Sequence, residues 1–383
     1  MTAVRSRSDP PGCWAIIAGG GTAGHVSPGL AIAGALVDAG HPADSIHYVG
    51  SERGIETRLV PAAGFSLTVL PGRGLQRRFS SDNIGAAWGL LRAFVRAFRL
   101  LGELRPRVVV ALGGYASVPA AFAAVCRRVP IVVAEQNAVP GMANRVAGRF
   151  AKVCAVSFPG TALPRAVVTG NPVREEIRVL DRAARRDAAR SAFGAGHGRV
   201  LVAAFGGSLG ARRINEAVLG LADAWSDRDD VVLRHVIGER DWEHYSERVR
   251  ARVLANDRGL LRYDAVRYED DMAALYAAAD LVVCRSGASS VAELALVGLP
   301  AVFVPLPGAP GDHQTANARA VVEAGGAVLV TDAELDATRL AEVLAPLVGD
   351  DVLRARMSQA AASLARPGAA QAVAKLVEEH ARG

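Results

Sequence analysis

Cysteine, lysine and long apolar runs are scarce in this sequence, and each scarcity excludes a class of protein. The four cysteines lie far apart, without the paired spacing of a disulfide framework or a zinc site. No stretch reaches the roughly 20 uninterrupted apolar residues that a membrane-spanning helix requires. Positive charge comes almost entirely from arginine, since Lys152 and Lys375 are the only lysines. We therefore expect a protein of the reducing cytoplasm whose membrane contact, if it has one, is peripheral.

The composition is that of a globular protein with room for two domains. The chain has 383 residues, of which 51% are hydrophobic and 21% charged, so there is enough apolar material for two packed cores. A net charge of +6 favours anionic partners such as nucleotides, pyrophosphates or an acidic membrane, without choosing among them. Residues 1–12 contain arginine and proline but no apolar segment, so we expect a flexible tail and no secretion signal.

Short apolar runs rich in β-branched residues alternate with helical patterns along both halves of the chain. In the first half we expect strands at 14–18, 46–49, 66–70, 107–111, 131–134 and 153–156, and helices at 28–39, 83–103 and 118–127. In the second half we expect strands at 199–204, 231–236, 260–263, 281–284 and 301–304, and helices at 211–225, 270–278, 289–297 and 313–324. This alternation predicts an α/β fold with two doubly wound parallel sheets, and the Gly170-Asn171-Pro172 cluster marks their boundary.

Each half begins with a strand that runs into a glycine-rich turn. Gly19, Gly21 and Gly24 have the G-x-G-x-x-G spacing of an anion-binding turn, and residues 206–210 form the corresponding turn of the second half. A dinucleotide site would need an acidic residue about 20 positions further on. Glu52 is the nearest candidate and stands somewhat far along. A nicotinamide-dependent oxidoreductase therefore remains an alternative.

Residues able to carry chemistry follow several strand ends. His25 comes directly after the first glycine turn, where a helix N-terminus favours a neutral imidazole that can accept a proton; a simple capping role is the alternative. Glu293 stands one turn into a helix after a Ser-Gly turn, which suits the chelation of ribose hydroxyls or only stabilisation of the helix. Polar groups also follow strands at 113–117, 135–137 and 311–318, and such loops commonly carry ligand chemistry.

In this order, and over nearly the whole chain, the motifs resemble the MurG family of glycosyltransferases. The segments that carry the resemblance are 19–25 with Pro28-Gly29, 113–115, 135–137, 170–174, 206–208, 285–287 with Glu293, and Gln314 with Asn317-Ala318. The resemblance implies a GT-B architecture, in which two Rossmann-like domains face a central cleft. It implies an acceptor- and membrane-binding domain at 13–172 and a UDP-sugar-binding domain at 173–364, with a C-terminal helix at about 365–383 packed on the first.

By the same resemblance, the chain is expected to be an inverting transferase of peptidoglycan synthesis. The implied donor is UDP-N-acetylglucosamine and the implied acceptor is undecaprenyl-linked muramyl-pentapeptide, at the anionic cytoplasmic face of the plasma membrane, with no nucleic acid involved. No cofactor or metal is expected, because no Asp-x-Asp pair follows a predicted strand. Another GT-B enzyme that uses a UDP-sugar to make a glycolipid is the alternative.

The resemblance also assigns residues to roles. Our own hypothesis for the catalytic base is His25, or alternatively Glu135 acting through a water. The substrate-binding candidates are Thr22, Ala23, Gly24, Tyr115, Asn137, Arg174, Ser208, Glu269, Arg285, Ala288, Ser289, Ser290, Val291, Ala292, Glu293 and Gln314. Ala23 stands where the family usually has a glycine, and it would strain the turn if its φ were positive.

Residues 73–103 mix arginines with large apolar side chains. The candidates for contact with lipid are Arg77, Arg78, Phe79, Trp88 and Arg92. Such a mixture suits peripheral docking on an anionic membrane. A core helix with one arginine-rich face in solvent is the alternative interpretation.

Overall fold

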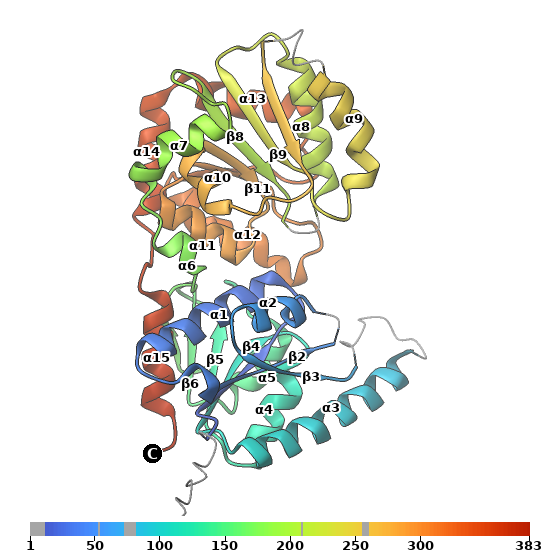
Figure 1. Ribbon diagram of the computed structural model, residues 1–383, viewed down its shortest axis with the longest axis vertical. Coiled ribbons are helices and arrows are strands. Elements are labelled where there is room, and N and C mark those ends of the chain that lie inside the picture. The colour runs from blue at the N-terminus through green and yellow to red at the C-terminus, as the bar shows by residue number, and fades with distance from the viewer. Residues whose placement is uncertain (1–11, 53, 73–81, 208–209, 255–259) are drawn as a thin grey trace, which may run out of the picture. The chain divides into compact units, whose positions relative to one another are not determined.

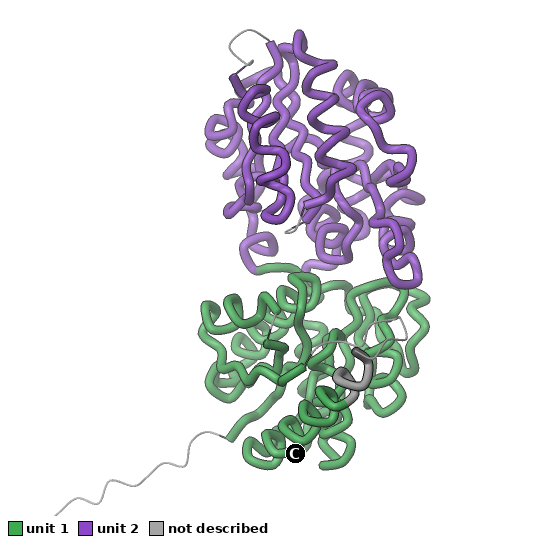
Figure 2. The backbone as a smooth tube through the Cα atoms, turned by 90° about the vertical axis from the view of Figure 1, so that its right-hand side faces the viewer, with its two compact units in different colours: residues 1–174, 368–383 green, residues 175–367 purple. Residues whose placement is uncertain are grey.

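The computed structural model of the protein describes residues 12–52, 54–72, 82–207, 210–254 and 260–383 (Figure 1). The chain forms two compact units (Figure 2). The first unit comprises the residues up to Arg174 together with Gly368–Gly383, and the second comprises Glu175–Pro367. The last segment of the chain thus belongs to the same unit as the first.

The first unit is built on a parallel sheet of seven strands in the order β3-β2-β1-β4-β5-β6-β7. The strands are β1 (Ala15–Gly19), β2 (Ile46–Ser51), β3 (Ser66–Leu70), β4 (Val108–Gly113), β5 (Ile131–Glu135), β6 (Val153–Val156) and β7 (Ala166–Val168). Helices cover both faces, so the central strands are buried on both sides and are apolar at every position, as parallel sheets require. Ile16 and Ile17, adjacent on β1, accordingly belong to two different core clusters.

The helices of the first unit divide between these two clusters. They are α1 (Ala23–Asp38), α2 (Glu56–Ala62), α3 (Asp82–Leu104), α4 (Ser117–Cys126), α5 (Met142–Gly148) and α15 (Ala369–His380), with a 3-10 turn at Ala43–Ser45. Side chains of α3 and α4 pack with Ile16, whereas side chains of α1 and α15 pack with Ile17. The C-terminal helix α15 lies against α1, and Val373 and Val377 are fully buried there or nearly so.

The second unit repeats the pattern with six parallel strands in the order β10-β9-β8-β11-β12-β13. These are β8 (Val200–Phe205), β9 (Val231–Val236), β10 (Arg262–Val266), β11 (Leu281–Cys284), β12 (Ala301–Phe303) and β13 (Ala327–Leu329). The helices are α6 (Glu175–Arg178), α7 (Arg182–Ala192), α8 (Arg212–Ala224), α9 (Trp242–Leu254), α10 (Met272–Ala278), α11 (Ala288–Val297), α12 (His313–Glu323), α13 (Ala337–Gly349) and α14 (Asp351–Ala362), with a 3-10 turn at Pro310–Asp312.

The two parallel sheets confirm the predicted fold class of two doubly wound, Rossmann-like domains. Both sheets place their first strand in the middle, and the chain order reverses beside it. Within the described part of the chain, no helix combines the length and the apolar character needed to cross a membrane.

Candidate active site

Ligands of open α/β sheets bind beyond the carboxyl ends of the strands, at the point where the strand order reverses. In the first unit this point lies between β1 and β4, and in the second unit it lies between β8 and β11. The glycine turns and the polar segments that the sequence singled out follow these four strands directly. The fold therefore places these turns at the switch point of their own unit, while Glu135, Glu269 and Gln314 follow other strands at the same carboxyl edges.

The first glycine turn rests on a buried carboxylate. Glu56, at the start of α2, is fully buried; its Oε2 accepts the Gly21 N–H at 2.9 Å, and its Oε1 accepts the N–H and hydroxyl of Ser51 at 2.7 and 2.8 Å. A Cβ at Gly20 would lie 2.2 Å from Oε1, so only glycine fits there. The sequence interpretation considered the exposed Glu52 and missed Glu56. A pyrophosphate on this turn would meet a carboxylate, which disfavours the dinucleotide alternative.

His25 lies in the first turn of α1, whose N-cap is Thr22. The backbone N–H of His25 donates to the Thr22 carbonyl at 3.1 Å, and its Nδ1 is 3.3 Å from the Thr22 hydroxyl. A Cβ at Gly113 would lie 3.2 Å from His25 Nε2 and 3.3 Å from Asn144 Nδ2, so the ring and the Asn144 amide both lie beside Gly113 at the end of β4. The half-buried imidazole thus occupies the switch point itself.

Thr22, Ala23 and Gly24 form the start of α1 together with His25. Ala23 is the first residue of the helix, and it is not among the described residues with positive φ. The strain that a positive φ would have caused is therefore absent at this position. Thr22 and Gly24 are exposed and Ala23 is half-buried, so this helix start faces solvent.

Glu135, the last residue of β5, is 3% exposed and organises the loop that follows it. Its Oε1 accepts the backbone N–H of Asn137 at 2.9 Å and the Asn137 side-chain amide at 3.2 Å. Its Oε2 accepts the Gly141 N–H and the Asn144 amide, both at 3.0 Å. Four donors therefore surround this carboxylate, and the side chain of Asn137 is positioned by it.

Tyr115, after β4, connects two loops at the same edge of the sheet. Its hydroxyl donates to the Pro71 carbonyl at 2.9 Å, just beyond the end of β3. Burial, aided by the nearby carboxylate of Glu52, raises the pKa of Tyr115, so the phenol stays protonated near neutrality.

In the second unit, the predicted residues at 288–293 all lie in the first two turns of α11. The helix begins after the extended N-cap Gly287 and has no acidic residue in its first turn. The hydroxyls of Ser286 and Ser289 are buried, and neither has a hydrogen-bond partner among the described residues. Buried polar groups normally have a hydrogen-bond partner. Two buried hydroxyls that lack one, beside a helix N-terminus, therefore indicate a ligand with acceptor oxygens.

Glu293 completes this group from within α11. The side chain is 4% exposed, and its Oε2 accepts a hydrogen bond from the Tyr276 hydroxyl of α10 at 3.0 Å. Among the other predicted residues of the helix, Ala288 and Val291 are buried, while Ser289, Ser290 and Ala292 are half-buried. The small side chains at the helix start leave its N–H groups open to close approach.

Arg285 and Gln314 brace the loops around this helix start. Arg285 Nη1 donates to the carbonyls of Val304 and Pro305 at 3.1 and 2.9 Å, and it forms an ion pair with Asp332 at 2.6 Å. Gln314 Oε1 accepts the Leu306 N–H at 2.9 Å. Both side chains therefore hold the segment that follows β12.

Glu269 follows β10 and is held by Arg234 of β9. The guanidinium donates to Glu269 Oε2 through Nε at 3.0 Å and through Nη2 at 2.7 Å. The two side chains are 10% and 11% exposed, so this is a largely buried ion pair. It fixes the segment in which the resemblance places the base of the nucleotide.

The remaining predicted residues fall into two groups. Ser208, Arg77, Arg78 and Phe79 lie outside the described residues. Arg174, the last residue of the first unit before the boundary, is half-buried. In the described part of the chain, no cluster of histidine, cysteine, aspartate and glutamate is suited to a metal ion.

Helix α3 packs one face into the core and exposes apolar side chains on another. Ala93, Ala97 and Leu101 pack into the core, as expected for a core helix. On its other side four large apolar side chains are 36–60% exposed: Trp88, Leu91, Val95 and Phe98. Their spacing of three and four residues places them on one face, and Arg92 is exposed beside them.

Comparison with known protein families identifies the class of protein. Residues 15–156 match the glycosyltransferase family 28 N-terminal domain, and residues 201–376 match the glycosyltransferase family 28 C-terminal domain. The chain therefore belongs to glycosyltransferase family 28. Its two matched regions correspond to the two sheets of the GT-B fold.

Individual proteins of similar sequence or structure point to one group within this family. The chain is 46% identical to the UDP-N-acetylglucosamine–N-acetylmuramyl-(pentapeptide) pyrophosphoryl-undecaprenol N-acetylglucosamine transferase of Nocardioides sp., over 95% of this chain and 97% of that one. It is 44% identical to the transferase of the same name from Acidothermus cellulolyticus, over 96% and 97%. The crystal structure of Acinetobacter baumannii MurG matches with a TM-score of 0.73 and 29% identity, over 95% and 99%. These findings confirm the resemblance to the MurG family.

Proposed function

We propose that the chain transfers N-acetylglucosamine from UDP-N-acetylglucosamine to the 4-hydroxyl of undecaprenyl-pyrophosphoryl-N-acetylmuramyl-pentapeptide, which converts lipid I to lipid II in peptidoglycan synthesis. The relatives named for this transferase match nearly the full length of the chain. The structural observation that carries the proposal is the pair of buried, unpartnered hydroxyls, Ser286 and Ser289, at the start of α11. Glu293 stands one turn further along the same helix.

The donor binds to this end of the second sheet. The diphosphate takes hydrogen bonds from Ser286, Ser289 and the first N–H groups of α11, where the helix dipole favours negative charge. The ribose hydroxyls donate to Glu293, which Tyr276 holds in place. Backbone groups near Glu269 read the uracil, because the Arg234 ion pair fixes that segment.

The reaction proceeds with inversion at the anomeric carbon. The muramyl 4-oxygen forms a bond to that carbon as the bond to the UDP oxygen breaks, and the hydroxyl proton passes to His25. Glu135 is the weaker candidate for this proton, because its two oxygens already accept four N–H groups. The start of α11 stabilises the negative charge that grows on the leaving diphosphate. The proposed step includes no metal or cofactor.

The acceptor is lipid-linked, and the proposed membrane contact is the exposed apolar face of α3. Trp88 and Phe98 mark its two ends, and Arg92 supplies positive charge for anionic headgroups. The enzyme thus works as a peripheral protein on the cytoplasmic face of the plasma membrane. In liposome flotation, wild type should float with vesicles containing anionic lipid, and Trp88→Ser combined with Phe98→Ser should not. Equal flotation of both proteins would contradict this contact.

Two measurements test the transfer itself. UDP and UDP-N-acetylglucosamine should raise the melting temperature, by the equivalent of about 2.7 kcal/mol at a hundredfold excess over Kd, while NAD should not. Radiolabelled sugar should then pass from the donor to a short-chain analogue of the lipid acceptor. Stabilisation by NAD, or transfer to a simple diacylglycerol but not to the muramyl acceptor, would contradict the proposal.

A further inference from the structure

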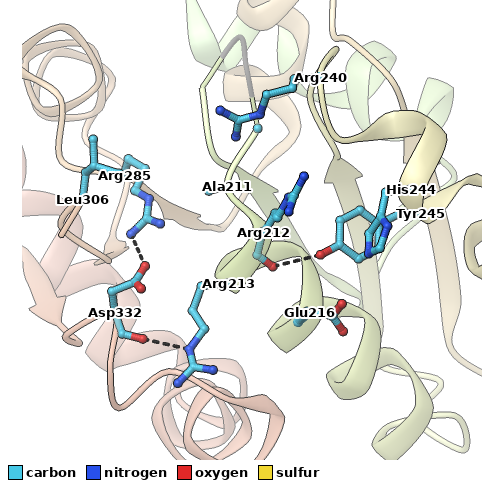
Figure 3. A pocket seen from close by; sticks show the side chains of 11 residues that line it. Ala211, Arg212, Arg213, Glu216, Arg240, His244, Tyr245, Arg285, Leu306 and Asp332 are labelled. Atoms are coloured by element: carbon cyan, nitrogen blue, oxygen red, sulfur yellow. Dashed lines mark hydrogen bonds and ion pairs between the residues drawn. The ribbon is translucent and has the colours of Figure 1, made fainter. Parts of the chain in front are cut away.

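The second unit has an open pocket of about 550 Å³ at the carboxyl edge of its sheet (Figure 3). Four arginines from three different segments line it: the neighbours Arg212 and Arg213 at the start of α8, Arg240 and Arg285. The volume falls within the range of roughly 300 to 1,000 Å³ typical of small-molecule sites, so a lone phosphate would fill only a small part of it. The pocket therefore suits a larger anionic ligand.

Positive charge exceeds negative charge around this pocket. Arg212 and Arg240 share one fully buried carboxylate, since both approach Asp241 Oδ1 through Nε, at 3.3 and 3.1 Å. Their side chains remain 68% and 54% exposed, so both guanidinium groups are accessible to a ligand.

The pairing of the other two arginines leaves positive charge in excess. Arg213 donates to the backbone carbonyls of Asp332 and Ala333, both at 2.9 Å, and Arg285 pairs with the Asp332 carboxylate (Figure 3). The carboxylate of Glu216, also in the lining, pairs with Arg248 at 2.7 Å. Five guanidinium groups thus meet three carboxylates.

A helix end adds to the positive potential. Helix α8 begins in the pocket wall at Arg212, after the N-cap Ala211, and it has neither a side-chain cap nor an acidic residue in its first turn. Its first N–H groups and its dipole therefore favour an anion, as the arginines do. The lining also includes Leu306, which is 44% exposed, and the ring of Tyr245. This mixture of cationic and apolar groups matches a short peptide better than an inorganic anion.

We propose that this pocket binds the peptide of the acceptor through its carboxylate groups. The inference rests on the proposed function, in which the attacking muramyl ring carries a pentapeptide. Because that ring must reach the anomeric carbon of the donor, its peptide lies within a short distance of the donor site. Arg285 lines the pocket and immediately precedes Ser286 of the donor site, so the pocket adjoins that site on the same edge of the sheet. The terminal carboxylate is then held by Arg240 and Arg213.

The test compares two acceptors that differ only in the C-terminus of the peptide, a free carboxylate in one and an amide in the other. Wild type should show a KM for the carboxylate roughly fivefold lower than for the amide, as expected for partly exposed ion pairs. Arg240→Gln combined with Arg213→Gln should abolish this preference, while Arg212 still pairs with Asp241 and protects the fold. Arg240→Lys should restore part of it. The matched control replaces Arg250 and Arg356, two exposed arginines outside the pocket, with glutamine.

Three outcomes would overturn the assignment. The first is equal KM values for the two acceptors in wild type. The second is that the double variant loses both its preference for the carboxylate acceptor and the rise in melting temperature caused by UDP. This result would place the two arginines in the donor site. The third is competition by inorganic phosphate at millimolar concentration against both acceptors alike, which would assign the pocket to a free anion. Absence of transfer to either acceptor would instead contradict the proposed function, so the two failures are distinguishable.

Discussion

The two glycine turns of this molecule occupy equivalent places in two similar sheets. The side chains around the first turn are negatively charged, whereas those around the second carry a net positive charge. Each turn lies against a fully buried carboxylate: a Cβ at Gly20 would meet Glu56, and a Cβ at Gly210 would lie 2.9 Å from Asp241 Oδ2. Among the described residues, Glu56 accepts hydrogen bonds only from N–H and hydroxyl groups. Asp241 is instead met by two guanidinium groups.

The difference indicates that the same doubly wound fold can present opposite charge at equivalent positions. The first turn rests on the carboxylate of Glu56, which disfavours a diphosphate, and it leads into the helix start that carries His25. The surroundings of the second turn carry excess positive charge, which suits an anionic ligand. The four predictions below test this division, from the largest expected effect to the smallest.

The division places proton transfer in the first unit, so His25→Ala should separate turnover from donor binding. We expect kcat to fall by about 10² to 10⁴, the usual contribution of a general base, while the Kd of UDP stays within twofold. Steady-state transfer assays and calorimetric titration with UDP measure the two quantities. His41→Ala, on the same unit and paired with Glu378, is the control. Near-normal turnover of His25→Ala would remove the first turn from the chemistry.

The second prediction concerns the carboxylate under the first turn. Glu56→Ala removes a fully buried acceptor from the N–H groups of Gly21 and Ser51, so we expect the free energy of unfolding to fall by about 1–3 kcal/mol. Glu56→Gln, which keeps the shape, should lose less. Urea unfolding gives the energies, and UDP affinity of the folded variants should remain that of wild type. A loss of UDP affinity in Glu56→Gln would show that the two turns do not act separately.

The third prediction concerns recognition of the nucleotide in the second unit. Tyr276→Phe removes a hydrogen bond to the buried Glu293, a charged acceptor, so UDP affinity should fall about tenfold. Wild type should also bind UDP more tightly than 2′,3′-dideoxy-UDP, and the variant should narrow that gap. Calorimetry with both nucleotides makes the comparison. An unchanged gap would mean that Glu293 serves the helix and not the ribose.

The smallest effect expected is a difference in acid response. His235 is fully buried between the hydroxyl of Tyr263 and the amide oxygen of Asn215, and burial lowers its pKa to about 3. Its ordinary pKa is near 6.5, so below that pH only the unfolded chain takes up the proton. Above pH 6.5 the ring is neutral in both states and does not lower the free energy of unfolding. As the pH falls from 6.5 toward 3, protonation of the unfolded chain alone lowers that free energy progressively.

Between pH 7 and 6 this single group should reduce the free energy of unfolding of the second unit by about 0.7 kcal/mol. Urea unfolding of wild type and His235→Gln at both pH values isolates the contribution. The variant should show a shallower dependence on pH. Parallel slopes would contradict the assignment of a neutral, buried imidazole.

The sequence predicted the central strands because they are buried on both faces and therefore apolar without interruption. The edge strands β7 and β13 were missed, since each has only three residues and β7 is exposed throughout. Helix α13 was also missed, although the spacing of Leu340, Leu344 and Leu347 is typical of a helix with one buried face.

The geometry of the candidate site was predictable where it depends on neighbours in sequence, and not where it depends on strand pairing. His25 and the segment at 288–293 stand next to their glycine turns. Glu56 reaches Gly20 only because β2 pairs with β1, and Arg234 reaches Glu269 only because β9 pairs with β10. The lining of the pocket likewise comes from segments after β8, β9, β11 and β13, which no local pattern connects.

The place of α15 sets an order on the synthesis of this protein. The core that contains β1 and α1 also contains Val373 and Val377, so an apolar face of the first unit stays open until α15 has left the ribosome. The second unit has all of its own segments earlier. The half of the molecule that is translated first is therefore completed last, and a nascent chain that stops short of residue 369 would expose that face to chaperones and proteases.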